Sequence, residues 1–220
     1  MTSNPSVSFH VRHNVWPDRL LETLRRIDRN EPIDGIVEGD RQVARAVSLR
    51  LLVAEAGPLT PLGIMALKAV SARPNLWGEL GHYLHYSIWD AQVPERNGFG
   101  YLYRLFCDYL FENQVVELIT KQTKREGNPR DDKVESSRDK LQRVCVQLSN
   151  SIEADPIFEQ RIEKGISLSP DSLTGVLKWL EALEPPVIED DQFARRDFCS
   201  PELLLLAIGF VMRDEPDAVG

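Results

Sequence analysis

The stretch that decides the fold runs from Asp40 to Gly63 and reads DRQVARAVSLRLLVAEAGPLTPLG. Its first half spaces apolar residues three and four positions apart, as along one face of an α-helix, so a helix is expected over Asp40–Glu55. Its second half contains Thr60-Pro61. The threonine hydroxyl can cap exposed backbone N–H groups, and proline at a first helical position loses no hydrogen bond. A further helix is therefore expected to begin at Pro61.

Four apolar residues follow Pro61 at helical spacing and are expected to face the core: Leu62, Met65, Ala66 and Ala69. The same helix signals recur along the rest of the chain. The pairs Ser169-Pro170 and Ser200-Pro201 repeat the pattern of Thr60-Pro61. Apolar spacing predicts more helices, over Pro17–Arg29, Leu76–Trp89, Tyr101–Ile119 and Lys133–Ile152.

Strand signals are weak by comparison. No run of alternating apolar and polar residues is convincing, so any sheet should be small. A short β-wing at Pro58–Leu62 is an alternative that the sequence does not exclude. These patterns predict an all-α fold. We expect a helix-turn-helix or winged-helix-like N-terminal module followed by a helical bundle.

The length of 220 residues allows one large or two small domains. Residues 121–132 (KQTKREGNPRDD) contain Gly-Asn-Pro and no large apolar residue, which is typical of a linker. We therefore expect a helix-turn-helix-like and aromatic-rich helical domain over residues 1–120 and a helical C-terminal domain with an acidic segment over residues 133–220. A second break is expected at Glu184–Arg196, which holds two prolines and an acidic run.

The net charge of −8 is unevenly placed. Residues 181–220 hold ten acids and three bases, so residues 1–180 carry a net charge of only −1. The negative overall charge therefore does not exclude nucleic acid as a partner of residues 1–180. No apolar run approaches the roughly 18 residues of a membrane span, and no secretory signal opens the chain, so a cytoplasmic protein without a membrane partner is expected. Three distant cysteines without a CxxC pair fit a reducing compartment.

The helices expected over Pro17–Arg29 and Asp40–Glu55, with Gly35 between them, have the order of a helix-turn-helix module. In such a module the N-terminal part of the second helix enters the DNA major groove. That part supplies Arg41, Gln42 and Arg45, whose side chains can bind guanine and adenine edges. Val43, Ala46 and Val47 would then face inward. Two ordinary packed helices with solvated arginines are the alternative.

A resemblance adds to this pattern. The run from Val37 to Arg50, followed by Leu59-Thr-Pro-Leu-Gly63, resembles an uncharacterised helical domain-of-unknown-function family, number 4007. The opening Phe9–His13 and the aromatic stretch Trp77–Trp89 are also similar to it, so the resemblance covers about residues 9–111. Family members are encoded beside DNA-phosphorothioation and PAPS-reductase-like genes in bacterial defence regions, which implies a DNA-associated defence role. Gly39-Asp40 departs from the family's glycine-lysine pair and removes a base there.

The four histidines come as two pairs, His10/His13 and His82/His85. Glu79, His82 and His85 follow one another at intervals of three residues, and two histidines with a carboxylate can bind zinc or iron. HExxH is absent, and the neighbouring aromatic residues favour histidines packed in a core. No P-loop, GxSxG or catalytic Cys-His signature is present, so no cofactor is expected and an enzyme is the less favoured class.

Function follows from these patterns as a ranked set of expectations. The first is a non-enzymatic DNA-binding or DNA-sensing component of a bacterial antiphage defence system, acting on plain or modified double-stranded DNA. Seven residues are expected to contact DNA: Arg41, Gln42, Arg45, Arg50, Lys121, Lys124 and Arg125. The alternative is a protein–protein adaptor or scaffold in a multi-protein defence complex, docking or forming a homodimer through the apolar run Leu203–Val211. A metal-dependent enzyme is the minor alternative.

Overall fold

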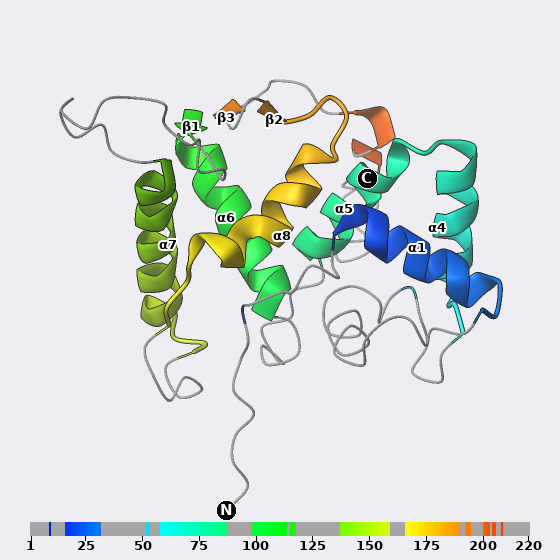
Figure 1. Ribbon diagram of the computed structural model, residues 1–220, viewed down its shortest axis with the longest axis horizontal. Helices are drawn as coiled ribbons and strands as arrows, with labels where there is room; N and C mark the ends of the chain where they lie inside the picture. The colour runs from blue at the N-terminus through cyan, green and yellow to red at the C-terminus, as the bar shows by residue number, and fades with distance from the viewer. Residues whose placement is uncertain are drawn as a thin grey trace, which may run out of the picture.

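The computed structural model describes residues 9, 16–31, 52, 58–87, 98–113, 115–117, 137–158, 166–189, 192–194, 200–202, 204, 205 and 208. Within these residues the chain forms six complete helices and one small sheet, so the expected all-α class is confirmed. Figure 1 shows α8 in the middle of the molecule, with α6 and α7 on one side and α1, α4 and α5 on the other. No helix in this described part is both long and apolar enough to cross a bilayer.

The front helices are α1 (Pro17–Asp28), α4 (Pro61–Ala72) and α5 (Leu76–Ser87). α4 begins where its cap predicts, because the Thr60 hydroxyl accepts a hydrogen bond of 3.1 Å from the backbone N–H of Gly63. α1 buries Leu20 and Leu24 and turns its arginines outward. The indole N–H of Trp77 donates to the carbonyl oxygen of Pro17 at 2.8 Å and so ties α5 to the start of α1.

The remaining helices are α6 (Gly98–Asn113), α7 (Ser137–Ala154) and α8 (Pro170–Glu181). α8 begins at the predicted Ser169-Pro170, where the Ser169 backbone N–H donates to the Ser172 hydroxyl at 3.1 Å. The side of α7 that faces the core buries five residues: Leu141, Val144, Cys145, Leu148 and Ile152.

Three short strands form an antiparallel sheet in the order β1-β3-β2: β1 (Val115–Glu117), β2 (Ile188–Glu189) and β3 (Gln192–Ala194). Val116 and Ile188 both lie opposite Phe193, one on each side of the central strand. The predicted helix over Tyr101–Ile119 is therefore wrong at Val115–Glu117, and the predicted break at Glu184–Arg196 carries two strands. These strands are too short to show a periodicity, and their pairing joins segments far apart in sequence.

The β-wing left open at Pro58–Leu62 is not found as a strand. Leu59 makes an isolated bridge, and Pro61 already belongs to α4. The winged-helix form of the N-terminal module is therefore not confirmed.

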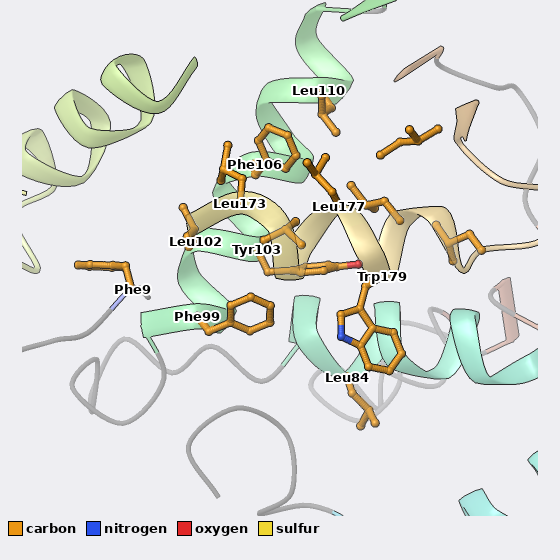
Figure 2. Close-up of a cluster of buried hydrophobic side chains, with 14 of the residues drawn as sticks. Phe9, Leu84, Phe99, Leu102, Tyr103, Phe106, Leu110, Leu173, Leu177 and Trp179 are labelled. Atoms are coloured by element: carbon orange, nitrogen blue, oxygen red, sulfur yellow. The ribbon is translucent and has the colours of Figure 1, made fainter. Parts of the chain in front are cut away.

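The core is one cluster to which α6 and α8 contribute the largest side chains (Figure 2). Tyr103, Phe106 and Trp179 are completely buried in it. α5 approaches α8 closely because Gly78 and Gly81 lack side chains: a Cβ at Gly81 would overlap the Trp179 indole, and one at Gly78 would overlap the carbonyl group of Ala182. Helices from both sides of the predicted linker share this cluster. Residues 121–132 lie outside the described residues, and the division into two domains stays a prediction.

Candidate functional site

The predicted DNA-contacting residues all lie outside the residues that the structure describes: Arg41, Gln42, Arg45, Arg50, Lys121, Lys124 and Arg125. Of the predicted helix Asp40–Glu55, only Leu52 is described. Leu52 is helical and completely buried, and its carbonyl oxygen accepts a hydrogen bond of 2.8 Å from Thr60 N–H. The absence of a side chain at Gly63 leaves room for this carbonyl. The proposed DNA-binding residues therefore remain a prediction.

The second predicted set begins with His85, which α5 places in the centre of the core. Its ring centroid lies 4.7 Å from that of Trp179, 5.2 Å from Phe99 and 5.3 Å from Tyr103. Neither ring nitrogen of His85 has a hydrogen-bond partner among the residues that the structure describes. Burial, with a smaller contribution from His82, lowers the pKa of His85 to about 3. The ring is therefore neutral at physiological pH.

His82 lies one turn earlier on α5 and does have a partner. Its Nδ1 atom lies 2.9 Å from the Tyr103 hydroxyl, and its ring stacks on Tyr86 with centroids 6.0 Å apart. Burial lowers the pKa of His82 to about 4. Tyr86 in turn donates to the Asp108 carboxylate at 2.9 Å and lies under the Arg104 guanidinium. A run of aromatic and polar contacts thus joins the buried His85 to charged groups at the surface of α6.

Glu79 is buried, with 4% of its surface exposed, and its Oε2 atom has no hydrogen-bond partner in the described part of the chain. It does not complete a metal site with the two histidines. In the described part of the chain, no three His, Cys, Asp or Glu side chains are placed to hold a metal ion. The geometry of the helix explains this, because residues six positions apart, such as Glu79 and His85, point about 120° apart. His10 and His13 lie outside the described residues.

The described surface offers a different feature, which is a set of large apolar side chains that face solvent. On α4 these are Leu62, Ile64 and Met65, and at the C-terminal end they are Leu204, Leu205 and Ile208. Met65 is 59% exposed and Leu205 is 68% exposed. The expectation that Leu62 and Met65 face the core is therefore wrong. α4 buries Ala66, as predicted, together with Gly63, Leu67 and Val70. Because the helix is apolar on nearly all sides, its spacing alone does not show which side packs.

The two apolar segments meet at an ion pair. The guanidinium of Arg73, directly after α4, contacts the carboxylate of Glu202, in the helical turn that begins at Pro201. Figure 1 shows this C-terminal segment, in orange, beside the connection between α4 and α5. We call the exposed side of α4, together with the exposed Leu204, Leu205 and Ile208, the docking face.

A groove lies next to the docking face, between the end of α1 and α4. Its volume is about 420 Å³, and its lining is Asp28, Ile64, Leu67, Lys68, Ser71 and Ala72. Ile64 and Leu67 make an apolar wall, and Lys68 is an exposed base beside it. Such a lining suits an apolar side chain with a polar group nearby, since Asp28 and Lys68 supply one charge of each sign.

Comparison with known proteins adds no family to this description. No family model, curated protein or solved structure matches the chain. The resemblance to the domain-of-unknown-function family stays a prediction from the sequence.

Proposed function

We propose that this protein is a non-enzymatic protein–protein adaptor of a bacterial defence complex, and that the docking face is its binding surface. One observation carries the proposal: six large apolar side chains on α4 and residues 200–208 face solvent. Isolated apolar residues are ordinary on a protein surface, but several gathered on neighbouring segments are typical of an interaction site. The assignment to a defence complex is supported by the sequence resemblance alone.

The exposure on α4 is costly without a partner. Burying a side chain such as Leu, Ile or Met contributes about 1.5–3 kcal/mol relative to leaving it in water. Met65 and Leu205 leave more than half of their surface in water, which a bound partner would recover. The charged residues Lys68, Arg73 and Glu202 would then supply polar contacts to an interface.

The experiment that tests this proposal is co-expression of the chain with the proteins encoded beside it in its genome. We expect one of them to elute with the chain from a size-exclusion column. Met65→Glu should abolish this co-elution, because it places a charge on the exposed apolar side of α4. Val146→Glu is the matched control, since Val146 is 51% exposed on α7, away from the docking face. The proposal fails if no neighbouring protein binds, or if both variants weaken binding equally.

A second candidate function is binding of duplex DNA through the predicted helix-turn-helix or winged-helix-like module. The observation in its favour is that Arg19 and Arg25 on α1 are exposed. Neither guanidinium has a carboxylate within 4 Å among the described residues.

DNA binding has its own test. Fluorescence anisotropy with a labelled DNA duplex should show salt-dependent binding, and the double variant Arg41→Ala with Arg45→Ala should weaken it. Unchanged binding in the double variant would reject those residues as the contact site.

A further inference from the structure

The groove between the end of α1 and α4 is lined by one acid and one base, Asp28 and Lys68. Both side chains are exposed. Neither forms an ion pair with the other or with any further residue that the structure describes. By contrast, Arg26 and Arg29 near the same end of α1 both pair with Glu22. Two opposite charges that line one groove without pairing can each bind one end of a ligand that carries both signs.

The side of α4 that lines this groove has an apolar part and a polar part. Four lining residues follow one another at helical spacing and so share one side of the helix: Ile64, Leu67, Lys68 and Ser71. Leu67 is buried and Ile64 is half-buried, so these two form an apolar wall. The Lys68 ammonium group and the Ser71 hydroxyl lie one turn apart, and both can donate hydrogen bonds to a carboxylate.

The opposite wall of the groove is the C-terminal end of α1. Asp28 is the last residue of this helix, and its carboxylate can accept hydrogen bonds from an ammonium group. The partial negative charge at a helix C-terminus favours a cation at the same place. The volume of about 420 Å³ lies within the range of small-ligand sites, which is about 300–1,000 Å³. The groove therefore offers partners to a carboxylate, to an ammonium group and to an aliphatic side chain.

We propose that this groove binds a free aliphatic α-amino acid such as leucine. The ligand carboxylate contacts Lys68 and Ser71, its ammonium group contacts Asp28, and its side chain lies against Ile64 and Leu67. Either end of a peptide supplies only one of the two charges, so a free amino acid matches the groove more completely. The inference goes beyond the adaptor role and does not depend on it, because it needs no partner protein.

Ligand-observed NMR titrations of the full chain test the site with three compounds that share one side chain. These are leucine, N-acetylleucine, which lacks the ammonium group, and leucine amide, which lacks the carboxylate. We expect leucine to bind most tightly of the three. Glycine carries both charges but no side chain, and it should bind more weakly than leucine because it leaves the apolar wall in water.

Two variants that each remove one charge locate the site. Lys68→Met and Asp28→Asn should each raise the dissociation constant for leucine about two- to fivefold, as expected for the loss of an exposed ion pair. Lys68→Met should not change the binding of leucine amide, and Asp28→Asn should not change that of N-acetylleucine. Lys178→Met is the matched control, because Lys178 lies on α8 outside the groove, with 40% of its side chain exposed. Circular dichroism checks that each variant keeps its helices.

Three outcomes would overturn the inference. Leucine does not bind, or one of its two analogues binds as tightly as leucine, or Lys178→Met weakens leucine binding as much as Lys68→Met does. None of these titrations includes a neighbouring protein. Failure of the amino-acid site and failure of the adaptor proposal are therefore seen in separate experiments.

Discussion

The imidazole of His85 packs edge-on against the indole of Trp179, with ring centroids 4.7 Å apart and an interplanar angle of 67°. This contact joins α5 to α8, and the glycine at position 81 allows it by admitting the indole to the surface of α5. The imidazole gains these ring contacts at the cost of two nitrogens without hydrogen bonds. The helix junction is therefore well packed but holds a polar group that is only partly compensated.

The free energy of unfolding should decrease in mild acid because of His85. The pKa of His85 is about 3 in the folded chain, against 6.5 for an ordinary histidine, so between these values the unfolded state binds more protons. The stabilising effect of a neutral His85 is complete above pH 6.5 and decreases as the pH falls toward about 3. The expected loss is about 1.4 kcal/mol per pH unit for His85 alone. Urea unfolding at a series of pH values measures it, and an equal slope in His85→Leu would contradict it.

Replacing His85 with leucine should stabilise the chain at neutral pH. The substitution nearly conserves volume and removes two buried nitrogens that have no partner. Each uncompensated polar group costs about 1–3 kcal/mol, so a gain of at least 1 kcal/mol is expected in the free energy of unfolding. A loss of stability would show that the ring contacts of His85 outweigh its unmet hydrogen bonds.

Two glycines that face the core should respond differently to alanine. Gly81→Ala should cost about 1–3 kcal/mol, because the added methyl group overlaps the Trp179 ring and α5 must move away from α8. Gly175→Ala is the matched change, since the nearest atom to its methyl group would be Phe99 Cε2 at 3.5 Å, an ordinary contact. It should be neutral or stabilising by up to about 1 kcal/mol, because alanine favours helix. Thermal unfolding compares the two variants, and an equal effect would contradict the close α5–α8 approach.

The Thr60 N-cap of α4 should contribute about 1 kcal/mol to the free energy of unfolding. Thr60→Ala removes the hydroxyl that accepts from Gly63 N–H, at the start of the helix that carries the docking face. Thr23→Ala is the comparison. The Thr23 hydroxyl donates a hydrogen bond to the Arg19 carbonyl oxygen within α1, and such a bond inside a helix contributes little to stability. Urea unfolding should therefore separate the two variants. Indistinguishable midpoints would mean that the Thr60 cap does not hold the start of α4.

The parts of the fold that could be predicted from the sequence are those set by interactions between residues close together in the chain. The starts of α4 and α8 follow from Thr60-Pro61 and Ser169-Pro170, because a cap involves residues within one turn. The strand β1 was missed because its pairing partner, Phe193, lies far away in the sequence. No local pattern distinguishes Val115–Glu117 from one more turn of α6.

The candidate site was less predictable than the fold. The helical spacing of Leu62 and Met65 is real, but α4 has apolar residues on nearly every side, so the choice of packed face is made by α1, α5 and Leu52. The sequence did indicate the apolar C-terminal run as an interaction segment, and Leu204, Leu205 and Ile208 are exposed there. Its contact with Arg73 depends on the folded arrangement and has no counterpart in sequence spacing.

The central claim is that Met65 becomes covered when the docking face is occupied. Mild peroxide oxidation followed by mass spectrometry measures this directly, because an exposed thioether is oxidised to the sulfoxide faster than a buried one. We expect Met65 to oxidise slowly in the complex with a neighbouring protein and quickly in the chain alone, and quickly in both samples for Leu205→Glu. Equal rates for Met65 in the wild-type chain alone and in that complex would contradict the claim.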